Sequence, residues 1–373
     1  MAGLRFGLIG TGFIGRAHAI ALKAVGTVFG IEAPVCELLA DTTTDSAAQA
    51  ARALGFRRST GDWQALVADP QVDVVDICTP NHLHREMALA AIRAGKSVYC
   101  EKPLANTAGE ALEIVQAAEA AGVRNHVGFN YIRNPMVRHA RELIRQGGIG
   151  DVCGFRGYYL EDYMRDPATP WSWRCQRSLA GAGALADLGS HLINAVHFLL
   201  EPVARVQGKL QTVYPVRPDP RDGRPRPVEN EDVARALFET GSGIPGTFEI
   251  SRIAGGYKCG LGFAVFGTRG TLTFDQERMN ELRLYTDGSP PGERGFRTLL
   301  AGPEHPDYAA FCPAPGHGLG INDLKVIEAR DVLRSFAGEG DPWPDFREGY
   351  RVQRVMEAIE QSHAAGGWVS VPA

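Results

Sequence analysis

The stretch RFGLIGTGFIGRAH, residues 5–18, decides how the chain begins to fold. A short apolar run leads into Gly10-Thr11-Gly12-Phe13-Ile14-Gly15, and apolar residues at helical spacing follow, so we predict a buried strand, a tight turn and a helix. Gly10 permits the turn, Gly12 lets the backbone approach a pyrophosphate, and Gly15 lets the helix and strand pack closely. The N–H groups at the start of the helix suit phosphates. This context favours dinucleotide binding over a purely structural turn.

The composition is that of an ordinary globular protein. The 373 residues suffice for two domains, at roughly 100–200 residues each. The net charge of −4 gives no reason to expect nucleic acid or a membrane as a partner. We expect no secretion signal, and no apolar run reaches the roughly 18 residues of a membrane span. The seven cysteines are widely spaced and lack a CxxC pair, which predicts reduced thiols in the cytoplasm and no metal site.

Strands and helices alternate through residues 1–129, which predicts a dinucleotide-binding domain of the α/β class with a doubly wound parallel sheet. Its later strands are expected at 36–41, 72–78, 96–100 and 125–129, and its later helices at 46–54, 82–94 and 107–121. In residues 130–373, strands follow one another without helices between them, which predicts a second, α+β domain with a large, mostly antiparallel open sheet.

The expected strands of this second domain are 152–159, 203–213, 233–239, 246–252, 262–266, 271–274 and 368–371. Its expected helices are 135–146, 323–336 and 346–364, the last of them placed to pack back on the first domain. Segments 162–182 and 287–318 are predicted to be irregular.

Asp41 ends the second expected strand. A carboxylate there suits the 2′-hydroxyl of the adenosine ribose and repels a 2′-phosphate, so it predicts NAD rather than NADP. Asp41 lies somewhat farther from the glycines than the usual distance of about 20 residues, which a longer connection around 26–30 explains. The alternative is that Asp41 only caps the helix at 46–54.

Two further turns lie at the carboxyl ends of expected strands, where open parallel sheets bind ligands. Thr79-Pro80-Asn81 follows the strand at 72–78, so we expect these residues, and His84 behind them, near the cofactor. Taken singly, His84 favours a place at a helix start over a catalytic role. Lys102 follows the strand at 96–100, and Pro103 disfavours helical geometry at Lys102. We therefore expect the lysine at the strand tip, beside the nicotinamide ring.

A candidate acid–base pair lies in the helical pattern of residues 181–200. Asp187 and His191 are four residues apart and share one helix face, with Asn194 a further turn along it. Imidazole titrates near neutrality, and a carboxylate orients it and stabilises its charged form, so the pair suits general acid–base catalysis. The alternative is a satisfied pair in the core. The preceding irregular segment is rich in aromatic and basic residues, namely Tyr163, Trp171, Trp173, Arg174 and Arg177.

Together these motifs resemble the Gfo/Idh/MocA oxidoreductases. The resemblance is carried in order by Gly10–Gly15, by Glu101-Lys102-Pro103 and by Gly183-Ala184-Leu185-Ala186-Asp187-Leu188-Gly189-Ser190-His191. Thr79-Pro80-Asn81 with His84, and Gly128-Phe129-Asn130-Tyr131, fit as well. The resemblance covers nearly the whole chain and is strongest to the inositol and levoglucosan dehydrogenase branches.

The resemblance implies a Rossmann domain followed by an α/β domain whose open sheet builds homodimers or homotetramers. It also implies that Lys102, Asp187 and His191 are catalytic, and that Trp173-Arg174 lies by the nicotinamide and the substrate. The cofactor-binding residues expected in all are Gly10, Gly12, Phe13, Ile14, Gly15, Asp41, Thr79, Pro80, Asn81, His84, Glu101, Lys102 and Asn130. The expected substrate-binding residues are Lys102, Tyr131, Tyr163, Trp173, Arg174, Asp187, His191 and Asn194.

The chain departs from the family pattern at Asn194, where the family often has Asp; this predicts a neutral contact to substrate. The aromatic segment suits stacking on a sugar ring. We therefore expect NAD-dependent oxidation of a secondary hydroxyl of a cyclic polyol or sugar, such as an inositol, aldose or anhydrosugar, to the ketone. The alternatives are an NADP-dependent keto-sugar reductase, a dehydrogenase of a non-sugar ring, and a non-catalytic cofactor-sensing regulator.

Overall fold

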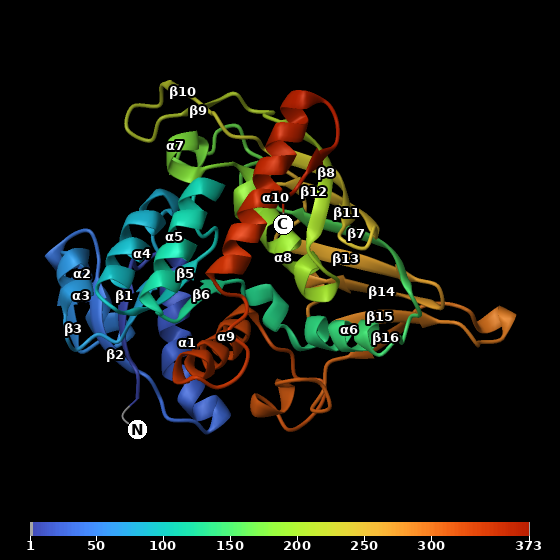
Figure 1. The fold of residues 1–373 in the computed structure, drawn as a ribbon, viewed down its shortest axis with the longest axis horizontal. Helices are drawn as coiled ribbons and strands as arrows, with labels where there is room; N and C mark the ends of the chain where they lie inside the picture. Colours follow the sequence, from blue (N-terminus) through green and yellow to red (C-terminus); the bar gives the residue numbers. More distant parts are fainter. Residues whose placement is uncertain (1–2, 373) are drawn as a thin grey trace. The chain divides into compact units, whose positions relative to one another are not determined.

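The computed structural model describes residues 3–372, and packing groups them into two compact units (Figure 1). Unit 1 takes the chain up to Arg133 together with Gly320–Tyr350, and unit 2 takes Asn134–Leu319 and the residues from Arg351 onward. Residues 320–350 therefore pack with the first unit although they come late in the chain. The domain boundary between residues 129 and 130 stays a prediction.

Unit 1 is built on a six-stranded parallel sheet in the order β3-β2-β1-β4-β5-β6. This confirms the predicted doubly wound sheet. Its strands are β1 (Arg5–Ile9), β2 (Val35–Ala40), β3 (Arg58–Thr60), β4 (Val74–Ile77), β5 (Ser97–Glu101) and β6 (Asn125–Gly128). Its helices are α1 (Phe13–Phe29), α2 (Thr44–Leu54), α3 (Trp63–Ala68), α4 (His84–Arg93), α5 (Ala108–Ala121) and α9 (Ile321–Ala337).

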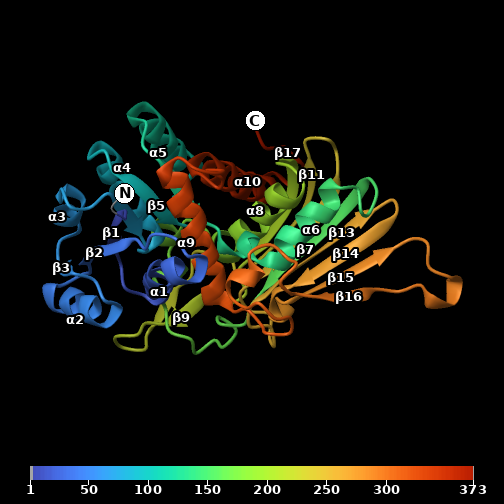
Figure 2. The same ribbon diagram turned by 90° about the horizontal axis from the view of Figure 1, so that it is seen from below.

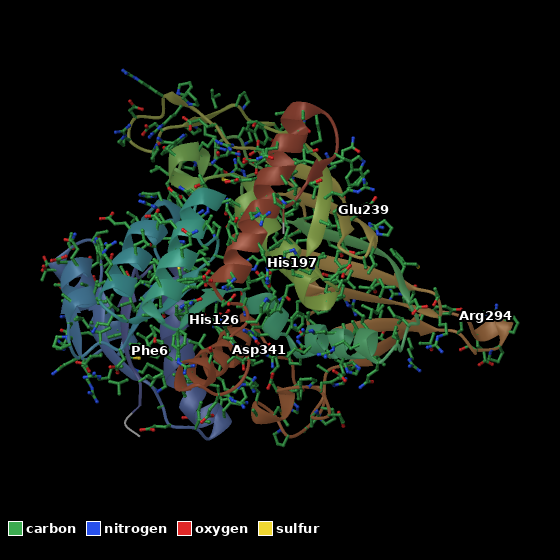
Figure 3. The ribbon with its side chains drawn as sticks, viewed as in Figure 1. Phe6, His126, His197, Glu239, Arg294 and Asp341 are labelled. Carbon is green, nitrogen blue, oxygen red and sulfur yellow. The ribbon has the colours of Figure 1, made fainter. Side chains whose placement is uncertain are left out.

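The central strands of this sheet are largely apolar because helices cover both faces. Phe6 and Leu8 on β1 are fully buried, and Figure 3 marks Phe6. Helix α1 packs along α9, which Figure 2 shows beside it. The strand order reverses beside β1, which pairs with β2 on one side and β4 on the other. The carboxyl ends of β1 and β4 therefore form the switch point at which such sheets bind ligands.

Unit 2 contains a nine-stranded sheet in the order β16-β15-β14-β13-β7-β12-β11-β8-β17. Within residues 3–372, β7 and β12 pair in parallel and the other neighbouring strands of this sheet pair antiparallel. Its strands are β7 (Val152–Leu160), β8 (Val203–Gln211), β11 (Val233–Thr240), β12 (Pro245–Ser251), β13 (Gly260–Gly267), β14 (Gly270–Asp275), β15 (Glu281–Thr286), β16 (Arg297–Leu300) and β17 (Val369–Ser370). The predicted large, mostly antiparallel sheet is confirmed.

Helices α6 (Pro135–Arg145) and α8 (Ser190–Leu199) pack on strands of this sheet, and Figure 2 shows them on the same side of it. Helix α10 (Phe346–Ala365) begins in unit 1 and ends in unit 2. Strand β11 shows the alternation that one covered face requires, since Ala234, Ala236 and Phe238 are buried whereas Leu237 between them is 48% exposed.

Several short elements differ from the expectation. Strands β9 (Val216–Pro218) and β10 (Pro225–Pro227) form a separate hairpin. The sequence predicted no strand there, because the preceding expected strand ended at residue 213. The segment 287–318, expected to be irregular, contains β16, and 162–182 contains the short helix α7 (Arg177–Ala180). In unit 1, β3 and α3 were likewise not expected, and in unit 2 neither was β15, which has six residues. Each is only three to six residues long, too short for a periodic pattern to show.

Candidate active site

The glycine turn of unit 1 has the geometry of a phosphate cradle. Gly10 has φ 96°, and a Cβ on Gly15 would lie 2.1 Å from the Gly10 carbonyl oxygen, so neither position tolerates a side chain. A Cβ on Gly12 would meet no atom within 4 Å, so the space above it is open to a ligand. Helix α1 has no side-chain cap and no acidic residue in its first turn, and Phe13 is 79% exposed. The N–H groups there suit an anionic group such as a pyrophosphate.

Asp41 lies directly after β2 and contacts this turn. The Thr11 hydroxyl donates to the Asp41 carboxylate, which also accepts from the backbone N–H of Thr42 at 2.7 Å. The cap of α2 is Thr43, whose hydroxyl accepts from the N–H of Ser46 at 3.1 Å. The alternative role of Asp41 as a helix cap is therefore wrong, and its place beside the glycines fits the ribose of NAD.

His84 ties together the two turns that follow β4 and β5. Its ring nitrogens lie 2.9 Å from the carbonyl oxygen of Thr79 and 2.8 Å from that of Pro103. Burial lowers the pKa of His84 despite these acceptors. The ring is fully buried, so it supports Thr79-Pro80-Asn81 on one side and the turn carrying Lys102 on the other. Direct contact of His84 with the cofactor stays a prediction.

Glu101, the last residue of β5, holds the backbone of the turn that follows the strand. One of its carboxylate oxygens accepts from the backbone N–H of Lys102 at 3.1 Å. The other lies 2.5 Å from Nζ of Lys325 and 2.9 Å from Nε2 of His18. Burial would raise the pKa of Glu101, but the cations Lys325 and His18 hold it well below its usual range. The carboxylate therefore binds buried groups of the protein, and its contact with the cofactor stays a prediction.

A buried charged cluster thus lies beneath the cofactor turns. Nδ1 of His18 lies 2.9 Å from Asp76, and Nζ of Lys325 lies 2.8 Å from Glu328. Burial works against protonation of His18, but attraction to Asp76 together with the hydrogen bonds to Asp76 and Glu101 outweighs it and raises the pKa of His18 to about 9. His18, Asp76 and Cys78 are close enough to hold a metal ion. Both ring nitrogens of His18 already face carboxylates, so Lys325 is the cation that this cluster accommodates.

Sequence reasoning missed this cluster. His18 closes the opening stretch, but its partner Lys325 is 307 positions away, and no local pattern links them. Asn130 and Tyr131 begin a short 3₁₀ turn one residue after β6, and their contacts with cofactor and substrate stay predictions. Asn130 is buried and Tyr131 partly exposed.

In unit 2, Asp187 lies in a π-helical turn, Leu185–Gly189, that continues into α8. Such wide turns within helices are frequent at functional sites. The sequence predicted the helix but not this turn. Its start is capped from a distance by Glu231, whose carboxylate accepts from the N–H of Leu185 at 2.7 Å and of Gly183 at 2.9 Å. Burial raises the pKa of Glu231.

Residues from the preceding loop gather around Asp187. The Tyr163 hydroxyl donates to its carboxylate at 2.7 Å, and Nε of Arg174 lies 3.5 Å from the same oxygen. Partial burial and the Asp187 charge raise the pKa of Tyr163 well above its usual value. The Arg174 guanidinium lies 4.4 Å from the centre of the Trp173 ring. Two predicted substrate-binding residues, Tyr163 and Arg174, thus contact a predicted catalytic carboxylate, and a third, Trp173, stacks on Arg174.

His191 and Asn194 follow on the same helix and are buried, at 7% and 1% exposed. The ring of His191 lies 6.1 Å from that of Tyr159 on β7, tilted by 58°. The chemistry available in this unit is a carboxylate, an imidazole, a phenol and a guanidinium, a set that can hold a hydroxyl-rich ligand and move a proton.

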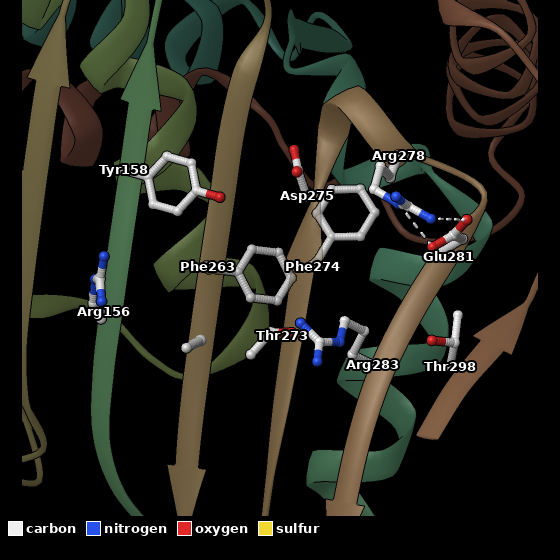
Figure 4. A pocket seen from close by; sticks show the side chains of 11 residues that line it. Arg156, Tyr158, Phe263, Thr273, Phe274, Asp275, Arg278, Glu281, Arg283 and Thr298 are labelled. Carbon is white, nitrogen blue, oxygen red and sulfur yellow. Dashed lines mark hydrogen bonds and ion pairs between the residues drawn. The ribbon is translucent and has the colours of Figure 1, made fainter. Parts of the chain in front are cut away.

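A hollow of about 540 Å³ lies over strands of the nine-stranded sheet, apart from these residues. Figure 4 shows its lining, with Arg278 and Glu281 paired at 2.9 Å along one side. None of the predicted site residues lines it.

Comparison with known proteins gives the class to which fold and site belong. Residues 4–129 match the model of the oxidoreductase family with an NAD-binding Rossmann fold, and residues 137–273 match the GFO/IDH/MocA C-terminal domain. The chain therefore belongs to the Gfo/Idh/MocA oxidoreductases, which confirms the resemblance. It is an NAD-dependent oxidoreductase, as predicted.

Particular relatives are similar along the full length. Levoglucosan dehydrogenase of Pseudarthrobacter phenanthrenivorans is 39% identical, over 100% of this chain and 99% of that protein. A solved levoglucosan dehydrogenase in complex with NADH and levoglucosan has TM-score 0.96 and 39% identity, with both chains fully covered. An NAD binding oxidoreductase from Klebsiella pneumoniae has TM-score 0.95 and 45% identity, again over the whole of both chains. Within residues 3–372, no helix is long and apolar enough to cross a membrane.

Proposed function

We propose that this NAD-dependent sugar or polyol dehydrogenase acts on an anhydrosugar of the levoglucosan type and oxidises a secondary hydroxyl to the ketone. The observation that carries the proposal is the contact of Tyr163 and Arg174 with Asp187, on the helix of His191, with Trp173 stacked on Arg174. The aromatic face suits the apolar face of a sugar ring, and the polar groups suit its hydroxyls. The full-length similarity to levoglucosan dehydrogenase supports the same substrate class.

The proposed roles follow from the chemistry of each group. NAD, when bound on the glycine turn, supplies the acceptor for the hydride that leaves the carbinol carbon. His191 accepts the hydroxyl proton, and Asp187 on the same helix favours its charged form. Lys102 stabilises the developing alkoxide. Asn194, a neutral amide, contacts substrate through hydrogen bonds.

An NAD-reduction screen with the purified protein tests this assignment. Levoglucosan and other anhydrosugars, inositols, aldoses and uronic acids are compared by kcat/KM from the absorbance of NADH. We expect the highest kcat/KM with an anhydrosugar. A clear preference for inositols would move the substrate to the polyols, and no reduction with any compound would refute sugar oxidation altogether.

The alternative functions are less well supported. The NADP-dependent reductase is not favoured, because Asp41 lies by the glycine turn and the similar solved enzyme carries NADH. A regulatory protein without catalysis would have no use for Lys102 and His191 together.

We also propose a cytoplasmic location and a homodimer or homotetramer built through the nine-stranded sheet. None of the seven cysteines, all within the described residues, forms a disulfide, in keeping with a reducing compartment. The sheet exposes apolar side chains such as Leu237 and Phe266, at 48% and 40%. Light scattering on Leu237→Glu and on the unchanged protein tests the association, and equal masses for both would contradict it.

A further inference from the structure

The hairpin β9–β10 is separate from the large sheet of unit 2 (Figure 1). Its residues 216–227 include four arginines. Two of its arginines are solvated, since the side chains of Arg221 and Arg224 are 80% and 85% exposed. Arg217 is different, because it is 1% exposed. Burying a guanidinium is costly unless its donors are satisfied, so the partners of Arg217 show what its burial achieves.

Those partners are three backbone carbonyls of one loop turn. Nη2 of Arg217 donates to the Met164 carbonyl at 2.5 Å. Nη1 donates to the carbonyls of Asp166 at 2.9 Å and Thr169 at 3.4 Å. The guanidinium also lies 5.3 Å from the centre of the Tyr214 ring. A planar fork of donors holds several acceptors in fixed directions, which an ammonium group cannot do.

Trp171 provides a second tie between this loop and the hairpin. Its backbone N–H donates to the Pro218 carbonyl at 2.8 Å, and its indole N–H donates to the Pro227 carbonyl at 2.9 Å. The guanidinium of Arg226 stacks 3.2 Å from the centre of its ring. Trp171 also packs on the buried cluster of Met164, Cys175 and Val228. Both strands of the hairpin thus hold the same tryptophan.

The segment after β10 fixes the end of the loop. The N–H of Glu229 donates to the Cys175 carbonyl at 2.8 Å, and its carboxylate accepts from the N–H of Arg177 at 2.8 Å. Nδ2 of Asn230 donates to the Arg174 carbonyl at 3.0 Å. The loop is therefore attached to the hairpin at its beginning, middle and end.

The residues that the hairpin holds lie next to the residues at Asp187 in the sequence. Tyr163 and Arg174 contact Asp187, and Trp173 stacks on Arg174. Tyr163 directly precedes Met164, and Trp173-Arg174 lies between Trp171 and Cys175. We infer that Arg217 is a positioning residue, and that the β9–β10 hairpin clamps the loop so that Tyr163, Trp173 and Arg174 are presented to Asp187. The clamp sets affinity for the sugar, a consequence that rests on the proposed function. The glycine turn that suits the pyrophosphate of NAD belongs to unit 1 and is not part of the clamp.

The test compares Arg217→Met and Arg217→Lys with Arg224→Met, a matched control on the same hairpin. Loss of the fork is expected to raise KM for the sugar about tenfold or more, with a smaller change in kcat. Affinity for NADH, followed by its fluorescence, is expected to change much less than KM for the sugar, because the glycine turn lies outside the clamped loop. Arg217→Lys is expected to lie between Arg217→Met and the unchanged protein.

A second readout needs no substrate. Arg165, Arg174 and Arg177 are trypsin sites within the clamped loop. We expect Arg217→Met to be cut there about tenfold faster or more, with cleavage elsewhere unchanged when the sites are identified by mass spectrometry. Arg224→Met is expected to be cut at the original rate. Should Arg217→Met fail to fold, Trp171→Phe removes the indole hydrogen bond to Pro227 while keeping an aromatic ring, and is expected to give the same loop-specific cleavage.

The outcomes separate the two claims. If Arg217→Met matches Arg224→Met in both KM and loop cleavage, the clamp is refuted whatever the substrate. If loop cleavage accelerates but the unchanged protein oxidises no sugar, the clamp stands and the proposed function fails. Faster cleavage with an unaltered KM would refute the link between the clamp and sugar affinity.

Discussion

His191 and Lys102 are the residues on which the proposed chemistry depends. A positioned base or acid contributes about 10²–10⁴-fold to rate, so we expect His191→Ala and Lys102→Ala each to lower kcat by at least about 10². NADH affinity of His191→Ala is expected to be unchanged, which fluorescence titration measures. His197, on the same helix α8, provides the control, because His197→Ala is expected to keep turnover. Turnover near that of the unchanged protein in His191→Ala would remove the histidine from the mechanism.

At this scale the sequence predicted residues that lie in motifs and missed those that act across the chain. Lys102 and Asp187 follow from their place after a strand and on a helix. Arg217 does not, because its partner Met164 lies 53 positions away and is engaged through a backbone carbonyl. Every residue has a backbone carbonyl, so the sequence does not show which carbonyl a distant side chain will bind.

Helix α8 and its π-turn depend on one distant carboxylate. Replacing Glu231 by Ala leaves the N–H groups of Gly183 and Leu185 without their acceptor. Each buried, unsatisfied donor costs roughly 1–3 kcal/mol, so we expect the free energy of unfolding to fall by at least that amount. Glu231→Gln keeps an acceptor oxygen and is expected to cost less.

Urea unfolding measures this loss. The control is Glu249→Gln, which removes one end of an exposed pair with Arg235. Such pairs contribute about 0–1 kcal/mol, so little change is expected. If Glu231→Ala unfolds at the same urea concentration as the control, the carboxylate does not hold the turn. Kinetics on the same variant would show whether Asp187 loses its position.

The elements that the sequence predicted well are the long ones with a regular apolar period, such as α1, α5 and α9, and most strands of the two sheets, although β3, β15 and β16 were not expected. The misses include β3, α3 and the β9–β10 hairpin, whose few residues are largely exposed or polar. Tertiary contacts, rather than local preference, hold such segments. The π-turn escaped prediction for the same reason, since its cap comes from Glu231.

Across the whole of unit 1, stability is expected to depend on the proton of His18. Its pKa rises from 6.5 to about 9 on folding, so the folded state binds this proton more tightly than the unfolded chain. The resulting contribution is fully present below pH 6.5 and is lost as pH rises through about 9. A shift of this size corresponds to roughly 3 kcal/mol.

Urea unfolding between pH 6 and 10 tests this dependence, with His18→Asn as the comparison. The variant is expected to lose less stability over the same interval. An NMR titration of the His18 ring gives an independent check that needs no variant. A ring that titrates near its ordinary pKa would contradict the prediction.

The division of the chain into interleaved units bears on how the protein is made. Unit 1 is completed by residues 320–350, and Lys325 reaches Glu101 across 224 positions. During synthesis from the N-terminus, the first three hundred residues emerge before Lys325 is made. Until then, His18 is the only cation of this cluster that can pair with Glu101 and Asp76. A nascent or truncated chain that ends before α9 would carry the glycine turn without its buried counter-charge, and would be a natural substrate for chaperones.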